Sequence, residues 1–238
     1  MNEIELHEAE VAARFDLLHR RFKPSNRVDD VRAEALRAAL EPLGLRGLRV
    51  LDLGCGKGRF GSFLMSAGAQ VVGLDISLAM LHHAKPALPE RVLGSARRLP
   101  FAACAFDAVV AVEVFEHIHG RVINDVLIEV RRVLRPGGAV VIVDKNVASL
   151  NARRTWLPNL VLKWIDERRG LWMYITGGAA RERWFWPRGF QSRLRGLFER
   201  VEIEHLLTPE EGENRLLRHV PAARLFAVWT ARAPGGRA

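Results

Sequence analysis

Short apolar runs alternate with helix-like segments along most of the chain. Apolar residues that recur every three or four positions indicate amphipathic helices, whereas short apolar runs bounded by glycine, proline or polar residues indicate strands. The pattern predicts helices at Glu8–Phe22, Val28–Leu40, Gly58–Ala67, Ser77–Lys85, Arg121–Leu134 and Pro187–Leu197. It predicts strands at Arg49–Leu53, Gln70–Leu74, Arg91–Leu93, Ala108–Val112, Ala139–Val143, Glu199–Leu206 and Arg224–Thr230.

The order of these elements predicts an α/β fold. A helix between two strands gives a right-handed crossover, so the alternation from Arg49 to Val143 indicates a mostly parallel sheet. The last two predicted strands have no room between them for such a helix, and we expect them to form an antiparallel pair at one side of the sheet.

Composition limits the class of protein. With 238 residues, 49% of them hydrophobic, the chain can bury one substantial core, which favours one domain with an insertion. No apolar run approaches the roughly 20 residues that cross a bilayer, and the amino terminus is acidic where a secretory signal would be basic. We therefore expect a cytoplasmic protein. Its two cysteines, Cys55 and Cys104, are too few for a disulfide framework or a thiolate metal cage.

Positive charge and tryptophan are concentrated in one segment. Residues 151–200 carry eleven Lys or Arg against four acidic residues, which is +7 of the total formal charge of +9, and five of the six tryptophans. Tryptophan interleaved with arginine suits an anionic aromatic or lipid-linked small molecule, a membrane surface or RNA. The run WLPNLVLKWIDERRGLW has an apolar face with basic flanks, which favours docking at an interface. Alternatively, Trp156, Trp164 and Trp172 pack this segment on the sheet.

The stretch VLDLGCGKGRF, from Val50 to Phe60, leads from a predicted strand through a glycine loop into a predicted helix. A G-x-x-x-x-G-K-[ST] phosphate loop is excluded, because Gly58 follows Lys57 and the glycine spacing differs. A G-x-G-x-x-G dinucleotide loop would need glycine at Arg59, so nicotinamide binding stays possible on spacing alone.

Two aspartates favour a different ligand. A carboxylate at Asp52 would repel a pyrophosphate and attract a cationic group such as an ammonium or a sulfonium. Asp75, which ends the second predicted strand, can accept hydrogen bonds from both hydroxyls of a ribose. Together they favour a nucleoside with a positively charged tail.

Several motifs, in order, resemble the class I S-adenosylmethionine-dependent methyltransferases. Between about Asp30 and Val143 these are VLDLGCGKGRF, VVGLDIS, GSARRLPFAACAFDAVVAVEVFEHI and RRVLRPGGAVVIVD. Within that family, these motifs most resemble those of the small-molecule methyltransferases of ubiquinone and menaquinone biosynthesis. The resemblance implies S-adenosyl-L-methionine as cofactor and a Rossmann-like, doubly wound, seven-stranded, mostly parallel sheet with an antiparallel C-terminal strand and an inserted helical lid.

The resemblance also implies one methyltransferase domain over residues 1–238. Its expected parts are N-terminal helices (1–45), a cofactor-binding core (46–145), a substrate lid (146–189) and a C-terminal helix with antiparallel strands (190–231).

Carried onto this sequence, the family's cofactor site assigns Asp52, Gly54, Cys55 and Gly56 to the methionine part, Asp75 to the ribose, Ile76 to the adenine, and Ser95, Ala96 and Arg97 to the adenine edge. Relatives usually have aspartate where Ser95 stands, and a hydroxyl accepts from the adenine amino group more weakly. Glu113 would lie beside the methionine part and the substrate pocket.

The N-terminal segment RFDLLHRRF adds a further likeness. Its Arg14 and Phe15 resemble residues that close over the cofactor in such relatives. Plain core packing of this predicted helix is the alternative.

Catalysis needs few residues, because a sulfonium is an activated leaving group and a base serves only a nucleophile that must lose a proton. We expect the catalytic residues to be His117, as a base for a phenol or enol hydroxyl, and Glu113. Alternatively, Glu116 and His117 cap and orient their loop. The E-x-x-E-H spacing of Glu113, Glu116 and His117 could bind a divalent ion, but the same letters occur in relatives that need none, so no metal is predicted.

The expected function is methyl transfer to a small, hydrophobic or anionic acceptor, with oxygen the favoured atom. The lid would determine the acceptor, and residues 151–189 could contact a membrane or a lipid-linked substrate. Methylation of tRNA or small RNA through the basic aromatic lid is the alternative. A catalytically inactive binding module is disfavoured, since nearly all the expected cofactor residues are present.

Overall fold

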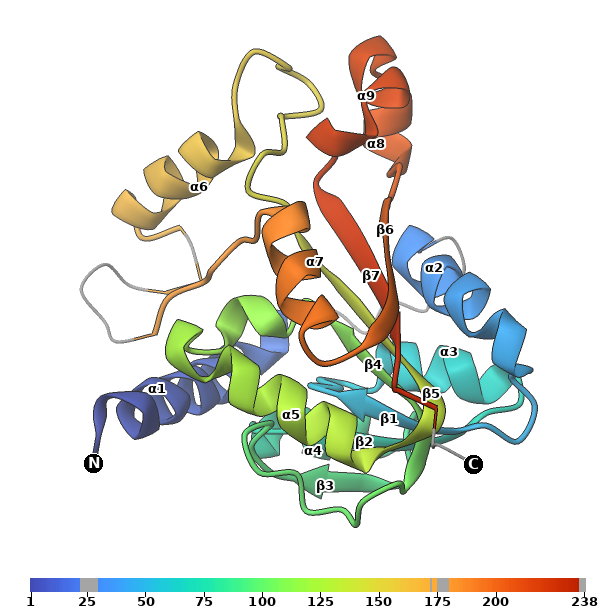
Figure 1. The fold of residues 1–238 in the computed structure, drawn as a ribbon. Helices are drawn as coiled ribbons and strands as arrows, with labels where there is room; N and C mark the ends of the chain where they lie inside the picture. The colour runs from blue at the N-terminus through green and yellow to red at the C-terminus, as the bar shows by residue number, and fades with distance from the viewer. Residues whose placement is uncertain (22–29, 172, 175–179, 236–238) are drawn as a thin grey trace.

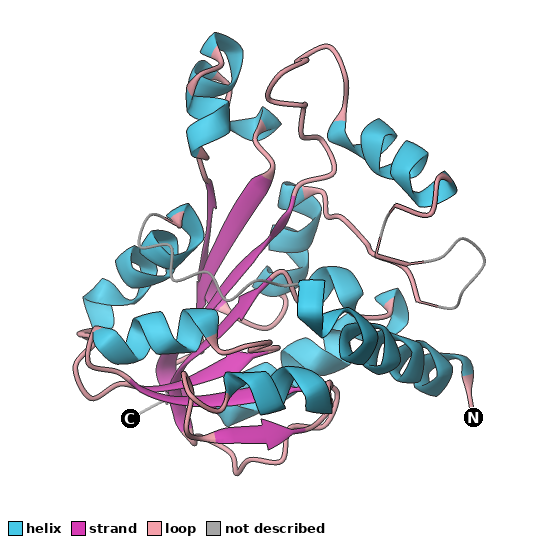
Figure 2. Ribbon diagram, turned by 180° about the vertical axis from the view of Figure 1, so that it is seen from behind, coloured by secondary structure: helices cyan, strands magenta, loops and turns pink. Residues whose placement is uncertain are grey.

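The protein is built on a central seven-stranded sheet with helices on both faces (Figures 1 and 2). The computed structural model describes residues 1–21, 30–171, 173–174 and 180–235. The strands are β1 Arg49–Leu53, β2 Gln70–Asp75, β3 Arg91–Leu93, β4 Phe106–Val112, β5 Leu134–Lys145, β6 Glu199–His205 and β7 Phe226–Arg232. The α-helices are α1 Glu3–Leu18, α2 Val31–Leu40, α3 Arg59–Ser66, α4 Leu78–Ala84, α5 Ile123–Val133, α6 Asn159–Arg168, α7 Pro187–Arg195, α8 Pro209–Gly212 and α9 Arg215–His219.

The sheet has the order β3-β2-β1-β4-β5-β7-β6. Neighbouring strands are parallel from β3 to β5, whereas β7 is antiparallel to both β5 and β6. The predicted α/β fold, with its antiparallel C-terminal strand, is thereby confirmed. Strand order reverses between β1 and β4, and in such sheets the crevice for a ligand opens at the carboxyl ends of the strands around that point.

The helix starts differ from the predicted ones because of their caps. α1 begins at Glu3 instead of Glu8, since the Asn2 side chain accepts hydrogen bonds from the backbone of Ile4 and Glu5 while the Glu5 carboxylate accepts from the Asn2 backbone. Asp30 caps α2, and Ser77 caps α4 as its position suggested. The predicted helix ends at Phe22 and Val28 lie outside the described residues.

β5 begins at Leu134, five residues before its predicted start. The Arg-Pro-Gly-Gly sequence does not end the pairing with β4 but shifts its register between Phe106 and Ala108. Gly137 has a φ of +76°, and a Cβ on Gly138 would lie 2.8 Å from the Asp107 carbonyl oxygen. The two glycines therefore permit an irregularity that a side chain would prevent.

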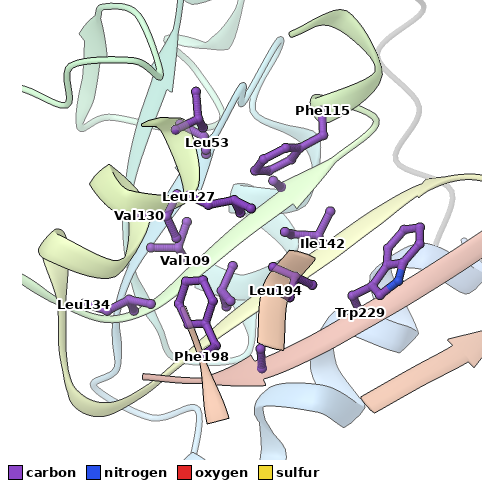
Figure 3. Close-up of a cluster of buried hydrophobic side chains, with 14 of the residues drawn as sticks. Leu53, Val109, Phe115, Leu127, Val130, Leu134, Ile142, Leu194, Phe198 and Trp229 are labelled. Atoms are coloured by element: carbon purple, nitrogen blue, oxygen red, sulfur yellow. The ribbon is translucent and has the colours of Figure 1, made fainter. Parts of the chain in front are cut away.

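The inner strands β1, β2, β4, β5 and β7 are mostly buried, which explains their nearly continuous apolar runs, whereas the edge strands β3 and β6 are more exposed. On one face, α5 and α7 pack on the sheet through residues that include Val109, Leu127, Ile142, Leu194 and Trp229 (Figure 3). A second cluster on α2, α3 and the strands contains Leu36, Leu64 and Val141. In the part of the chain described, no helix is long and apolar enough to cross a membrane.

Candidate functional site

A cavity of about 820 Å³ opens at the carboxyl ends of the strands, within the size range of small-molecule sites. Its wall includes residues that follow or end β1 to β5 in the central sheet: Gly54, Cys55, Gly56, Asp75, Ile76, Ser95, Ala96, Arg97, Glu113 and Lys145. All the residues expected at the cofactor except Asp52 thus line one cavity, although they come from distant parts of the sequence.

The glycine loop after β1 forms one wall. Gly54 has a φ of +68°, and a Cβ there would lie 2.5 Å from the side chain of Val114, so this position excludes other residues. Gly56, with a φ of +51°, has no atom within 4 Å of such a Cβ. Its backbone N–H donates to Asp75 Oδ2 at 2.8 Å. The loop therefore leaves open space beside its backbone and is tied to the end of β2.

Asp75 is held by two backbone N–H groups. Its Oδ2 accepts from Gly56 and its Oδ1 accepts from Ser77, each at 2.8 Å. Burial raises the pKa of Asp75, although these hydrogen bonds act against that rise. Each carboxylate oxygen can accept a second hydrogen bond, which is what the two hydroxyls of a ribose need.

Asp52 lies beneath the loop instead of on the cavity wall. It is buried, and its Oδ2 accepts from the Gly61 backbone N–H at 2.9 Å. Burial and the nearby charge of Asp75 raise the pKa of Asp52 to about 7. Burial also raises the pKa of the Cys55 thiol, which lines the cavity in its neutral form.

Ser95 has a carboxylate partner that sequence reasoning missed. The Ser95 hydroxyl donates to Glu8 Oε1 at 2.8 Å, and Arg97 Nη1 donates to Glu8 Oε2 at 3.3 Å. Glu8 comes from α1 and lines the cavity itself. The sequence does not indicate this contact, because Glu8 and Ser95 are 87 positions apart in the chain and Glu8 belongs to no recognised motif.

α1 covers part of the cavity, to whose wall it contributes Val11, Phe15 and other side chains. Asp16 fixes the helix to the start of α4 by accepting from the Ser77 hydroxyl at 2.5 Å. Arg14 does not line the cavity, but its Nε donates to the Met173 carbonyl oxygen and so joins α1 to the segment after α6.

The cavity wall also carries a group of ionisable side chains that includes Glu113, Glu116, Lys145 and Glu182. The Lys145 ammonium lies 2.6 Å from Glu116 Oε1 and 3.1 Å from both Glu113 Oε2 and Glu182 Oε1. Glu113 also pairs with Arg32 of α2. Its φ of +56° is uncommon for a residue other than glycine, and such backbone strain concentrates at functional sites.

The charges in this group stabilise one another. Burial alone would lower the pKa of Lys145, but the three glutamates raise it well above its ordinary value, so the side chain stays an ammonium. Burial would raise the pKa of Glu113 and Glu182, yet Lys145 holds both below their ordinary values, that of Glu182 at about 2. Burial and the charge of Glu116 raise the pKa of Asp144, the neighbour of Lys145.

Both ring nitrogens of His117 have partners. Nδ1 lies 2.9 Å from the Tyr174 hydroxyl, and Nε2 lies 3.3 Å from Glu116 Oε1. Glu116 Oε2 is buried and has no hydrogen-bond partner in the described part of the chain. These contacts suit an orienting role for the pair.

The geometry does not favour the metal hypothesis. The place that a cation would take between Glu113 and Glu116 is held by the ammonium of Lys145. Among the residues with a described position, no group of three or more His, Cys, Asp or Glu side chains could hold a metal ion.

Comparisons with known proteins identify the family of the chain. The family model described as a methyltransferase domain matches residues 51–142. A demethylmenaquinone methyltransferase of Beutenbergia cavernae is 39% identical over 140 residues, which are 57% of this chain and 58% of that protein. A demethylmenaquinone methyltransferase of Mycobacterium sp. (strain KMS) is 34% identical over 161 residues, 65% of this chain and 67% of that protein. The crystal structure of an S-adenosylmethionine-dependent methyltransferase from Mesorhizobium loti superposes with a TM-score of 0.65 at 22% identity, covering 86% of this chain and 98% of that one.

The chain therefore belongs to the class I S-adenosylmethionine-dependent methyltransferases, and its cofactor is S-adenosyl-L-methionine. It spans about three fifths of the length of the curated relatives that it matches first. The cavity fits this cofactor, because Asp75 offers acceptors to a ribose and Glu113 offers negative charge to a sulfonium or ammonium group. The solved structure, at its low identity, shows the shared fold alone.

Proposed function

We propose that the protein transfers a methyl group from S-adenosylmethionine to a small, hydrophobic, uncharged acceptor, with oxygen the favoured atom. The observation that carries this proposal is the cavity that joins Asp75 and the glycine loop to the carboxylates around Lys145. The three glutamates there outnumber their cationic partners Lys145 and Arg32 by one charge, which disfavours an anionic acceptor, a class that the sequence alone left open. The relatives named for methylation of demethylmenaquinone support a hydrophobic small molecule.

We assign the cofactor contacts as the sequence motifs suggest, with one addition. Gly54, Cys55 and Gly56 would hold the methionine part by close backbone approach. Asp75 would bind the ribose hydroxyls, and Ile76 would pack on the adenine. The buried Asp52 would act on the positive charge from beneath the loop, without direct contact.

The addition is Glu8. Because relatives use an aspartate where this chain has Ser95, the adenine amino group lacks a carboxylate acceptor from the loop after β3. Glu8 supplies a carboxylate at the same place, where it already accepts hydrogen bonds from Ser95 and Arg97. Ser95, Ala96 and Arg97 would then contact the adenine edge together with α1.

When bound, S-adenosylmethionine supplies a methyl group on a sulfonium that needs no further activation. The chain's own residues orient the acceptor and exclude water, a task for α1 and for the lid that we assign to residues 146–189. We assign the removal of a hydroxyl proton to Glu116 and His117, because both residues line the cavity and lie next to each other. Glu113 stays ionised beside the positive charge.

Cofactor binding tests this proposal through Asp75. We expect Asp75→Ala to weaken binding of S-adenosylhomocysteine roughly 100-fold or more, since two hydrogen bonds to a charged acceptor are lost. The exposed Asp125→Ala, on α5, is the matched control and should bind as the wild type does. Unchanged affinity of the Asp75 variant in calorimetric titration would refute the assignment of the site.

A further inference from the structure

α6 presents three of its apolar side chains to solvent and buries the side chain of a lysine. Leu160, Val161 and Trp164 are 42%, 40% and 50% exposed, whereas Lys163 is only 7% exposed. The Lys163 ammonium is paired with Glu167, one turn further along the helix. A surface helix of a globular domain normally has the opposite arrangement, with its apolar stripe on the core.

Other exposed apolar side chains adjoin this helix in the sequence. Trp156, which precedes α6, is 77% exposed, and Leu171, which follows it, is 69% exposed. In both views α6 lies at the periphery of the molecule, away from the sheet (Figures 1 and 2). We call Trp156, Leu160, Val161, Trp164 and Leu171 the apolar lid face. Such a concentration of exposed apolar residues in one short segment of the chain indicates an interaction surface.

Basic side chains flank the apolar lid face. Arg154, Arg168 and Arg169 are all exposed, and the Arg168 guanidinium lies 4.2 Å from the centre of the Trp164 ring. Arg153 is exposed as well, but it pairs with Glu210. Apolar and aromatic side chains bordered by arginine are the pattern of a helix that lies in the interface of an anionic bilayer.

The apolar lid face leads to the cavity. The backbone N–H of Leu171 donates to the Asp166 carbonyl oxygen of α6 at 2.9 Å, so Leu171 is fixed to the end of that helix. Leu171 and Met173 both line the cavity. An apolar molecule that leaves a bilayer at α6 would therefore meet an apolar side chain of the cavity wall directly.

We propose that the apolar lid face docks on an anionic lipid bilayer and receives a hydrophobic acceptor from it. Docking is independent of the proposed methyl transfer, whereas delivery of an acceptor rests on it. The aliphatic side chains of Leu160 and Val161 favour lipid over RNA, because single-stranded RNA is bound by aromatic stacking and positive charge, to which aliphatic side chains add little.

Sedimentation with vesicles tests the docking. The wild type should bind vesicles made of equal parts phosphatidylcholine and phosphatidylglycerol more tightly than phosphatidylcholine alone. The combined substitutions Leu160→Ser, Val161→Ser and Trp164→Ser should weaken binding roughly tenfold or more. A control with Leu78→Ser, Leu93→Ser and Ile128→Ser, which are 57%, 53% and 51% exposed elsewhere on the molecule, should bind as the wild type does.

Charge reversal gives a second, independent measurement. Arg168→Glu with Arg169→Glu should weaken binding to the anionic vesicles by at least roughly 30-fold, at the usual contribution of a basic residue near such a surface. Arg131→Glu with Arg195→Glu, which are exposed on α5 and α7, is the control of equal charge.

Three results would overturn the proposal. The first is a wild type that fails to bind anionic vesicles at low salt. The second is binding of tRNA, weakened by the same substitutions, in place of vesicle binding. The third is a dimer that the serine substitutions dissociate while vesicles are not bound. Titration with S-adenosylhomocysteine separates this proposal from the proposed function, because the docking variants should bind that molecule normally while Asp75→Ala should still bind vesicles.

Discussion

Replacement of Lys145 by methionine tests how much the ammonium of Lys145 stabilises the folded protein by neutralising the glutamates around it. Lys145→Met keeps the apolar stem but removes the charge that faces Glu113, Glu116 and Glu182. The side chains of Glu116 and Glu182 are only 1% and 2% exposed, so each would lose a counter-charge in a place that water hardly reaches.

Two values indicate how much stability the substitution would remove. The fall in the pKa of Glu182 from its ordinary value of 4.5 to about 2, for which Lys145 is the main favourable cause, corresponds to about 3 kcal/mol. Breaking a buried ion pair by removing one partner costs about 3–5 kcal/mol. We therefore expect Lys145→Met to lower the free energy of unfolding by about 3–5 kcal/mol at neutral pH.

The loss of stability in the Lys145 variant should depend on pH. In the wild type, the depressed pKa of Glu182 gives stability that is fully present above pH 4.5 and is lost as the pH falls towards 2. In the variant, the buried carboxylates lack a counter-charge, so their pKa values rise and the folded state gains a proton that it releases as the pH increases. The deficit of the variant should therefore be larger at pH 8 than at pH 5.

Urea denaturation of the cofactor-free protein at both pH values measures this effect. The exposed Lys85→Met is the control, and it should change the free energy of unfolding by less than about 0.5 kcal/mol. A Lys145 variant as stable as the wild type at pH 8, or a deficit that does not depend on pH, would refute the electrostatic account of this cluster.

Two further predictions concern the cofactor site. Glu8→Gln should remove discrimination between S-adenosylhomocysteine and its deaminated analogue S-inosylhomocysteine in titrations. On the proposed assignment, the wild-type carboxylate would accept from the adenine amino group and repel the oxygen that replaces it, so retained discrimination would exclude Glu8 from the adenine site. Asp52→Asn should make the cofactor-free protein more stable than the wild type, by up to about 4 kcal/mol above pH 7, with the difference vanishing near pH 4, because the pKa of Asp52 rises from 3.8 to about 7 on folding. Identical pH profiles in urea denaturation would show that Asp52 is not buried as described.

The sheet was predictable from the sequence because its signal is local and strong. β1 and β3 have the predicted bounds, and β2 extends the prediction by one residue, since each strand is a short apolar run between turn residues. The bulged start of β5 was not predictable from periodicity, because Pro136 and two glycines usually end a strand. It depends on the contact of Gly138 with Asp107, which only the folded sheet provides.

The candidate site was predictable where a motif carries it. Gly54, Asp75 and Glu113 lie on the cavity wall because they end or follow parallel strands, whose carboxyl ends meet at one edge. Glu8, Lys145 and Glu182 could not be found in this way. Their roles depend on ion pairs and hydrogen bonds between elements far apart in the chain, and a single charged residue in a sequence does not indicate its partner.

Methyl transfer itself is the most direct test of the account. The purified protein would be incubated with S-adenosylmethionine that carries a deuterated methyl group, together with a lipid extract or with tRNA, and the products analysed by mass spectrometry. The account predicts labelled methyl groups on an uncharged small molecule of the lipid extract, in amounts that Asp75→Ala greatly reduces. Label found only in tRNA, or no labelled product from a protein that binds S-adenosylhomocysteine tightly, would contradict it.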